Sequence, residues 1–447
     1  MRGLKILPGK GQKNFDFIHT NGRYLNHINR RFLFMKQLFK RNFTMVVIGQ
    51  IISLFGNAIL RFALPLYLLR ETDSSSLFGA VTACSFIPMI VFSLFGGVIA
   101  DRKNKRNIMV VLDFTTAFVI FVYYAALGNV PFVPLMIAVL MILYGISGAY
   151  QPAVQASIPL LVEPDMLMSG NAVINMVSTL SGLLGPVIGG VLFGAFGIFP
   201  ILFISIGCFL ISAVMEIFIH IPFEERRDGR NVFQAVGRDL RECLIFMKKE
   251  KPIFLSILGI LALFNLFLSA AMIVGIPVMV VQVLQMSDTA LGITEAAMGL
   301  GGLAGGMAAG AAARKMRLEK GYLALTACAC SALFMGLSLF EPVPAGVGYV
   351  VITAASFAGM CASTMFSVSM LTVVGQQTPP QLLGKIMAVI MAVASCSQPL
   401  GQACYGVLFD LLSGKPYVVM IGAAAASMLV ALYSKRIFAR FGELVKS

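Results

Sequence analysis

The chain has 447 residues, of which 58% are hydrophobic and 12% charged, and its mean hydropathy is +0.88. An ordinary soluble domain carries about a quarter charged residues. This composition therefore excludes an ordinary soluble protein and predicts a membrane protein. The net charge of +14 does not indicate a nucleic-acid surface, since the basic residues gather in short segments between long apolar runs.

The apolar runs are long enough to cross about 30 Å of hydrocarbon as helices. They are continuous, unlike the alternating segments of about ten residues in a membrane β-barrel. We therefore predict an all-α membrane protein with twelve transmembrane helices. These lie at 44–69, 77–100, 107–128, 132–155, 168–194, 198–220, 254–282, 289–313, 321–340, 345–373, 382–411 and 416–437.

Polar segments divide this series of spans into domains. We predict a cytoplasmic N-terminal tail, in which Met35 is an alternative start of translation, and a linker with a surface helix. The helix is indicated by Phe233, Val236, Leu240 and Leu244, which recur at three-to-four spacing. The expected domains are the tail 1–43, a first six-helix bundle 44–220, the linker 221–253, a second six-helix bundle 254–438 and a tail 439–447.

The two halves repeat each other. A shift of 216 positions aligns 163–193 with 379–409 and matches proline and glycine positions that apolar composition does not explain. The repeat predicts two pseudo-symmetric bundles that rock about a central path. Lys and Arg concentrate in the tails and in the loops of one side. By the positive-inside rule, we expect a cell-membrane protein with both termini on the cytoplasmic side.

Two motifs carry a family resemblance. Gly97-x-x-x-Asp101-Arg102-x-Asn104-Lys105-Arg106 resembles the loop 2–3 signature of the major facilitator superfamily. Asn104 stands where that family usually has glycine; asparagine tolerates a left-handed backbone, so we expect the tight turn to survive. In the fifth span, the glycine–proline element resembles one associated with drug:proton exporters; its residues are Gly185, Pro186, Gly189 and Gly190.

A finer resemblance is to the drug:proton antiporter branch that includes macrolide efflux proteins and a siderophore exporter. It rests on Gly49-Gln50-x-x-Ser53-x-x-Gly56 in the first span and on Pro152-Ala153-x-x-Ala156-x-x-Pro159. Members of the branch often carry an acid directly after that last glycine of the first span. Here the position is Asn57, so the resemblance does not supply a proton site there.

Ionisable groups within spans are costly and need an explanation. Arg61 and Glu295 fall in the outer halves of the first and eighth spans, where Glu295 would take up a proton tuned by Arg61. The alternative is a structural clamp or a wet outer mouth. Asp113 is a third candidate for the proton pathway, against an alternative in which it anchors a basic residue of the preceding loop. Glu216 and Asp410 lie near span ends, where water would solvate them.

In the superfamily that this chain resembles, the first, fourth, seventh and tenth spans line the cavity. Their polar and soft side chains are therefore candidates for substrate contacts, although such residues also serve in packing or face lipid. The candidates are Gln50, Asn57, Tyr144, Gln151, Asn265 and Met365.

We also expect two cytoplasmic latches between the bundles. Asp101 would hold the start of the eleventh span near Lys385, and Arg314 or Lys315 would meet Glu163 or Asp165. The alternative is that these acids offset their own loops or cap helices. The latch residues are Gly97, Asp101, Arg102, Arg106, Lys385, Arg314, Lys315, Glu163 and Asp165.

Together these observations predict a secondary active transporter that exports amphipathic small molecules by alternating access, with proton antiport. The chain lacks a G-x-x-x-x-G-K-[ST] nucleotide loop, and its three histidines form no catalytic constellation, so we expect no enzyme, cofactor or metal. We expect a monomer in the bilayer. Open alternatives are an importer, a facilitator of another solute, a siderophore exporter and a membrane receptor.

Overall fold

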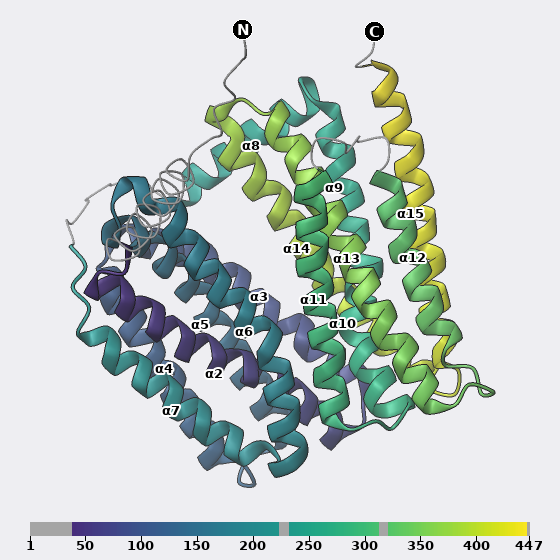
Figure 1. The fold of residues 1–447 in the computed structure, drawn as a ribbon, viewed down its shortest axis with the longest axis horizontal. Coiled ribbons are helices and arrows are strands. Elements are labelled where there is room, and N and C mark those ends of the chain that lie inside the picture. The colour runs from purple at the N-terminus through teal and green to yellow at the C-terminus, as the bar shows by residue number, and fades with distance from the viewer. Residues whose placement is uncertain (1–37, 223–231, 313–320, 445–447) are drawn as a thin grey trace, which may run out of the picture.

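The computed structural model describes residues 38–222, 232–312 and 321–444, and the regular structure within them is helical (Figure 1). Helices arise here because a backbone crossing hydrocarbon must satisfy its own hydrogen bonds. The helices of the first half are α2 (Arg41–Thr72), α3 (Ser75–Arg102), α4 (Lys105–Ala126), α5 (Phe132–Leu161), η1 (Pro164–Met166), α6 (Leu167–Phe196) and α7 (Ile198–Ile217).

The linker contains α8 (Val232–Lys249). The helices of the second half are α9 (Pro252–Phe264), η2 (Asn265–Ser269), α10 (Ala270–Pro277), η3 (Val278–Val283), α11 (Asp288–Ala312), α12 (Gly321–Leu337), α13 (Ala345–Gln377), α14 (Pro380–Leu411) and α15 (Pro416–Leu444). The short elements η2 and η3 are π-helical segments within the predicted span 254–282.

The predicted apolar ranges are helical over their described residues except at 127–128, 218–220 and 338–340, and ten of the described helices are long and apolar enough to cross a membrane. Two predicted spans fall short of that measure. The helix α12 has 17 residues, and α11 is rich in glycine and carries Glu295. The predicted N-terminal tail 1–43 is described only from residue 38, so Met35 lies outside the described residues. The predicted C-terminal tail 439–447 begins as a continuation of α15.

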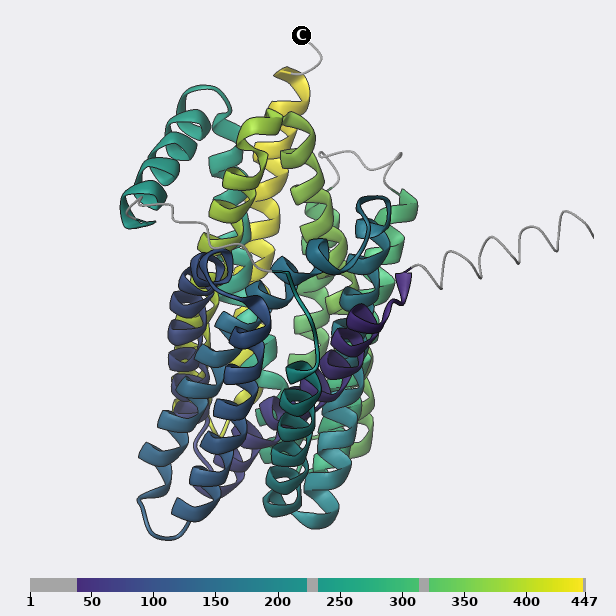
Figure 2. The same ribbon diagram turned by 90° about the vertical axis from the view of Figure 1, so that its left-hand side faces the viewer.

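Helices α2 to α7, the first group, pack mainly on one another, and so do α9 to α15, the second group. Figures 1 and 2 show the two groups side by side, from purple to teal and from green to yellow. They meet where α3 crosses α14 and where α6 crosses α11. The face that bears the start of α2 and the end of α15 is called the terminal side below, and the opposite face the far side.

The linker helix α8 lies against the second group on the terminal side (Figure 2). Part of its surface is covered by protein, because Cys243, Phe246 and Met247 are buried and the Phe246 ring lies 6.2 Å from that of Phe254, whereas Leu244 is 43% exposed. The helix predicted from sequence is present, and the side chains of Phe233, Val236 and Leu240 lie outside the described residues.

The conformation predicted for Asn104 is wrong. Its φ is −64° and its ψ is 117°, which is extended rather than left-handed backbone. The reason is that Asn104 is the N-cap of α4: its side-chain oxygen accepts a hydrogen bond from the Arg106 N–H at 3.0 Å. Asparagine therefore serves this loop by capping a helix.

Candidate functional site

The far side is closed by hydrogen bonds between the two groups. Asp410, at the end of α14, accepts bonds from the Ser74 hydroxyl at 2.9 Å and from the backbone N–H groups of Ser75 and Ser76 at 2.8 and 2.9 Å. A carboxylate at a helix N-terminus is favoured by unpaired N–H groups and by the helix dipole. Asp410 of the second group therefore caps α3 of the first.

A second polar contact closes the other crossing. Arg70, in the last turn of α2, donates to Asp288 from Nε at 3.0 Å and from Nη2 at 2.8 Å. Gln282 bridges the groups as well, because it accepts from the Ser75 hydroxyl at 2.7 Å and donates to Asp73 at 3.0 Å. The far side thus carries hydrogen bonds and an ion pair across the boundary between the groups.

Glycines let the helices touch at both crossings. A Cβ on Gly190 would lie 2.6 Å from the Asp288 carbonyl oxygen, and one on Gly406 would lie 2.6 Å from the Ser75 carbonyl oxygen. Small residues permit such approach between membrane helices. Gly190 and Gly406 are related by the same shift of 216 positions that aligns the two halves of the sequence. The two contacts are therefore equivalents within the repeat.

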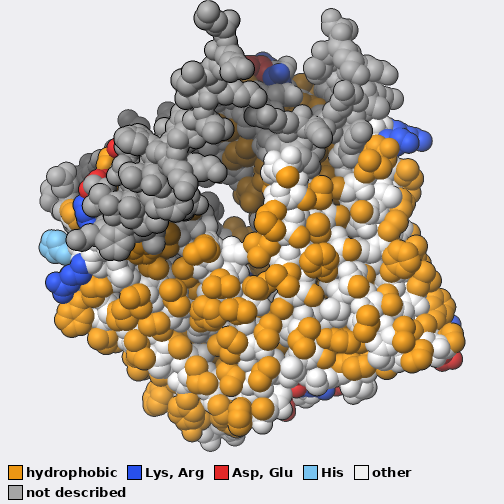
Figure 3. All heavy atoms as spheres, in the orientation of Figure 1, with side chains coloured by type: hydrophobic (Ala, Val, Ile, Leu, Met, Phe, Trp, Pro, Cys, Tyr) orange, Lys and Arg blue, Asp and Glu red, His pale blue; other side chains and the backbone are white. Residues whose placement is uncertain are grey.

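Between the groups, on the terminal side of these contacts, lies the main cavity, with a volume of about 790 Å³. Figure 3 shows a hollow between the groups on this side, above a surface covered largely by apolar side chains. The cavity is lined from α2, α3, α5, α6, α11 and α14, by Leu54, Asn57, Ala58, Arg61, Phe62, Met89, Ile90, Ser93, Ser147, Gly148, Gln151, Pro152, Gln155, Ser178, Ser181, Gly182, Pro186, Glu295, Ala388, Met391, Ala392 and Ser395.

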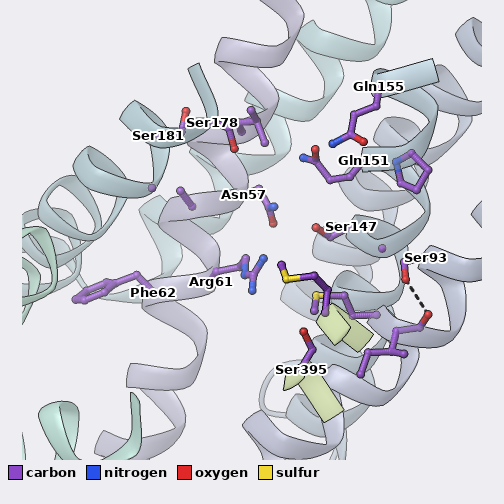
Figure 4. A pocket seen from close by; sticks show the side chains of 18 of the residues that line it. Asn57, Arg61, Phe62, Ser93, Ser147, Gln151, Gln155, Ser178, Ser181 and Ser395 are labelled. Carbon is purple, nitrogen blue, oxygen red and sulfur yellow. Dashed lines mark hydrogen bonds between the residues drawn. The ribbon is translucent and has the colours of Figure 1, made fainter. Parts of the chain in front are cut away.

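The lining combines apolar walls with a few polar groups, as small-molecule sites do. Figure 4 shows Asn57, Arg61 and Gln151 pointing into the same space, whereas Phe62 points away from it. The Arg61 guanidinium lies 4.4 Å from the centre of the Tyr144 ring, within cation–π range. This stacking fixes a positive charge at the inner end of the cavity.

Glu295 also lines the main cavity, and both it and Arg61 line a narrower extension of about 180 Å³ toward the far side. Within the described residues, no ion pair or hydrogen bond of Glu295 is found. The extension also contains Gln402, whose side chain is 0% exposed and whose amide oxygen and nitrogen both lack partners. Arg61 and Glu295 thus line the same two cavities, but no ion pair joins them among the described residues.

The structure places the predicted cavity residues in different environments. Asn57 and Gln151 line the main cavity, and Tyr144 lines the narrow extension. Gln50 lies instead in a buried polar cluster of the first group, where it donates to Tyr150. Asn265 and Met365 are not among the residues lining the main cavity; Asn265 donates to the Leu261 carbonyl at the start of η2.

The predicted latch residues lie on the terminal side, and only part of the set is described. Glu163 pairs with Lys40 at 2.7 Å, and Lys385 pairs with Glu242 of α8 at 2.8 Å. The four residues Gly97, Arg102, Arg106 and Asp165 lie at the end of α3, the start of α4 and in η1. Arg314, Lys315 and the side chain of Asp101 lie outside the described residues.

The glycine–proline element of α6 lies at helix contacts. Gly185 approaches Ala58 and Gly189 approaches Phe62, both of α2. Pro186 is close enough to Gly292 that a Cβ there would contact the Pro186 carbonyl oxygen. The element therefore joins α6 to its own group through α2 and to the second group through α11.

Of the two acids that were expected to be solvated at span ends, Glu216 is 1% exposed, whereas Asp410 is partly exposed and makes the far-side contacts described above. Asp113 is 2% exposed and accepts a hydrogen bond from Ser53 rather than from a basic residue of the loop. The position of Glu216 near the end of an apolar run concealed its burial, which follows from how neighbouring helices cover it. Among the described residues no group of three or more His, Cys, Asp or Glu could hold a metal ion.

Apolar helices around a polar cavity that opens on one side define a membrane transporter of small molecules. The sequence profile of the Major Facilitator Superfamily matches residues 46–402, and the chain belongs to this family. The family resemblance seen in the motifs is thereby confirmed, and membership makes the chain a transporter rather than an enzyme.

Individual relatives are distant. The chain is 23% identical to macrolide efflux protein A of Streptococcus pyogenes over 388 residues, covering 86% of this chain and 93% of that protein. It is 25% identical to the enterobactin exporter EntS of Salmonella paratyphi A over 378 residues, covering 83% and 86%. The crystal structure of the nucleoside transporter NupG has a TM-score of 0.69 at 14% identity, covering 89% of this chain and 99% of that one.

Proposed function

We propose that the protein exports amphipathic small molecules by alternating access, driven by proton entry. In this proposal the chain crosses the cell membrane twelve times in two six-helix bundles, 44–220 and 254–438, joined by the linker 221–253. The terminal side is cytoplasmic, because its loops carry most of the Lys and Arg. The conformation described above is then open to the cytoplasm, and the far side is the closed outer gate.

The observation that carries the proposal is the main cavity between the two groups. It is lined by both of them, opens on the terminal side and ends beneath the far-side contacts. Its methionines, prolines and serines provide an apolar surface with scattered polar groups, which suits ligands that combine both characters. The relatives named for macrolide efflux and enterobactin export favour outward transport.

Proton coupling is assigned in this proposal to Glu295, with Arg61 and Asp113 as further participants. Glu295 is the acid of the main cavity, and Arg61 faces the same space. An acid that loses a proton at one side and regains it at the other can couple the two openings of the cavity. The nine latch residues would hold the terminal side closed in the alternate state.

Cells with and without the protein provide the test. We expect lower accumulation of radiolabelled erythromycin or of ethidium in cells that carry the protein, and loss of that difference when a protonophore collapses the proton gradient. Higher accumulation in the carrying cells would identify an importer and overturn export. Lower accumulation that survives the protonophore would overturn proton antiport.

The enterobactin exporter among the relatives favours one alternative substrate class, iron-binding siderophores. Secretion of enterobactin by an exporter-deficient host is therefore measured in parallel. Restored secretion without any effect on erythromycin or ethidium would replace the drug-like class by siderophores. Absence of flux for all three compounds in proteoliposomes would favour a membrane receptor.

A further inference from the structure

A chain of buried polar groups runs through the first group, apart from the main cavity. The Gln50 amide donates to the Tyr150 hydroxyl at 2.7 Å, and that hydroxyl donates to Oε1 of Glu216 at 2.8 Å. The side chains come from α2, α5 and α7. The helix α7 packs on α2 here: a Cβ added at Gly49 would make ordinary contacts, 3.5 Å from the Ser212 hydroxyl and 3.9 Å from Oε1 of Glu216.

A second acid belongs to the same cluster. Ser53, one turn after Gln50 on α2, donates to Oδ1 of Asp113 on α4 at 3.3 Å. Asp113, Ser53 and Tyr150 line one small cavity of about 20 Å³, which is room for about one water molecule. This small cavity therefore connects the Ser53–Asp113 pair to the chain that ends at Glu216.

The small cavity adjoins the main cavity and shares lining residues with it. Leu54, Asn57, Ser147 and Gln151 line both spaces, so the polar walls of the main cavity continue toward Asp113. The carboxyl cluster is thus buried from lipid and from bulk solvent but adjoins the space through which a transported solute would pass.

The cluster lacks a compensating positive charge. Gln50, Asp113 and Glu216 are 0%, 2% and 1% exposed, and within the described chain neither acid forms an ion pair. One oxygen of each acid and the Gln50 amide oxygen have no hydrogen-bond partner. These orphaned oxygens are acceptors that a proton on a carboxyl group would satisfy.

Other titratable groups on the packed helices face elsewhere. Arg61 of α2 stacks over Tyr144 of α5, and Arg70 pairs with Asp288 on the far side. Cys208 of α7 lies beside Gly56, two turns from Glu216, and Lys105 and Arg106 begin α4 about two turns before Asp113. The helix α6 carries no titratable side chain. Asp113, Tyr150 and Glu216 are therefore the titratable groups that face one another.

Resting on the proposed proton antiport, we propose that Asp113 and Glu216 form a single proton-binding site, joined through Tyr150 and Ser53 and filled from the main cavity. Two unpaired carboxylates in a hydrocarbon interior are strongly disfavoured, and one proton removes one of the two charges. In the binding step a hydronium ion in the main cavity gives its proton to a free carboxylate oxygen. An O–H bond forms there, a water molecule is left behind, and the negative charge of the cluster falls by one.

The site lies where protonation can affect the transport path. Gln50 and Ser53 contact the cluster from α2, and Asn57 and Arg61, one and two turns later on the same helix, line the main cavity. The helix α2 also packs on α6, and α6 crosses α11. A change in the hydrogen bonds between the cluster and α2 is therefore transmitted to the boundary between the groups. Glu216, which was expected to be solvated, becomes a coupling residue in this proposal.

Infrared difference spectroscopy of the purified full chain in nanodiscs tests the site without a transport substrate. Titration between about pH 5 and pH 9 should reveal a carboxylic-acid C=O band, sensitive to deuterium exchange, that disappears as pH rises. The band should persist in Glu295→Gln and be lost when Asp113→Asn and Glu216→Gln are added to Glu295→Gln, a background in which Glu295 cannot itself contribute a carboxylic-acid band. Tyr150→Phe should shift its frequency, because the hydroxyl that donates to Glu216 is removed. Glu250→Gln, at an exposed acid, is the control and should leave the band unchanged.

Absence of a titrating band in the wild-type protein would overturn the proposal even if the triple variant failed to fold. So would a band that is lost in Glu295→Gln, or one that survives in the folded triple variant. The outcome is independent of the export assay. Proton-driven efflux without the band would overturn this site and leave the proposed function standing, whereas the band without any flux would support the site and overturn the export.

Discussion

At the scale of single residues, the main cavity presents one acid and one base that do not pair. Arg61 is held by stacking on Tyr144, so its charge stays in the cavity without neutralising Glu295. A carboxyl group without a cationic partner inside a membrane protein marks a functional site more often than a structural one. This arrangement leaves Glu295 available to exchange a proton with water in the cavity.

Replacement of Glu295 by glutamine separates coupling from binding. We expect Glu295→Gln to abolish efflux driven by a pH gradient, because the amide cannot carry a proton between the two sides, while exchange of substrate down its own gradient continues. Both rates are measured in proteoliposomes with ethidium or erythromycin. Glu250→Gln, at an exposed acid outside the cavity and the latch, serves as the control. Undiminished pH-driven efflux in Glu295→Gln would exclude this role.

The candidate site could be predicted only in part at this scale. Polar residues such as Asn57 and Gln151 stand out in an apolar sequence, and both line the main cavity. Glu216 and Asp410 stand near the ends of apolar runs, where hydration is the simple expectation. The burial of Glu216 and the hydrogen bonds of both acids depend on groups from α5 and α3, far away in sequence, and no local pattern contains that information.

At the scale of elements, glycines set how closely the two groups approach on the far side. Gly190 on α6 and Gly406 on α14 each face a backbone carbonyl of the other group, so even a methyl group there requires the backbones to separate. The closed far side is therefore held by shape as well as by the bonds of Arg70 and Asp410. Glycines at equivalent positions of the two halves therefore form equivalent contacts.

Alanine at these glycines should open the far side. We expect Gly190→Ala and Gly406→Ala each to shift the protein toward a state with a closed terminal side, since a Cβ at 2.6 Å from a carbonyl oxygen is not tolerated. Spin labels at Met168 and Met307, which are 88% and 72% exposed near the terminal-side ends of α6 and α11, report the accompanying closure of the terminal side through their distance distribution.

The matched control for these alanine variants is Gly207→Ala on α7, where no atom lies within 4 Å of the added Cβ. All three substitutions raise helix propensity by a similar amount, about 1 kcal/mol at most, so that effect cancels in the comparison. Equal distance distributions for Gly190→Ala, Gly406→Ala and Gly207→Ala would show that the glycine contacts do not govern the far side.

The elements themselves were largely predictable, because hydrocarbon imposes helices on long apolar runs. The linker helix followed from its three-to-four spacing. The π-helical segments η2 and η3 did not, since they arise inside one apolar run with Pro277 between them and no composition signal marks them. The Asn104 turn was misjudged because a family glycine suggested a left-handed backbone where the chain instead caps a helix.

At the scale of the whole molecule, the two sides must open in alternation, and the repeat supplies a contact set for each. The far-side set is formed in this conformation, with Asp410 capping α3 and Arg70 paired with Asp288. The terminal-side set belongs, in our proposal, to the opposite state, in which Glu163 exchanges its partner Lys40 for Arg314 or Lys315. Weakening one set should favour the state held by the other.

Loss of the Asp410 carboxylate therefore shifts the equilibrium in a known direction. Asp410→Ala removes three bonds that exist only with the far side closed, so we expect the terminal-closed population to rise by about tenfold, or about 1.4 kcal/mol. Asp410→Asn keeps one acceptor oxygen and should shift the population less. The labels at Met168 and Met307 measure both variants. An unchanged distribution in Asp410→Ala would mean that the cap of α3 does not hold the outer gate.

The terminal-side latch gives the opposite expectation. Arg314→Glu with Lys315→Glu places acids opposite Glu163 and Asp165, so repulsion should disfavour closure of the terminal side and lower transport, although exposed pairs contribute only about 0–1 kcal/mol each. Adding Glu163→Lys and Asp165→Lys restores opposite signs and should recover part of the transport. Combined with Asp410→Ala, the Arg314 and Lys315 reversal should return the label distances toward wild type, because the two changes weaken opposite states. If the variant with all four substitutions transports no better than the variant with Arg314→Glu and Lys315→Glu alone, closure of the terminal side does not depend on this latch.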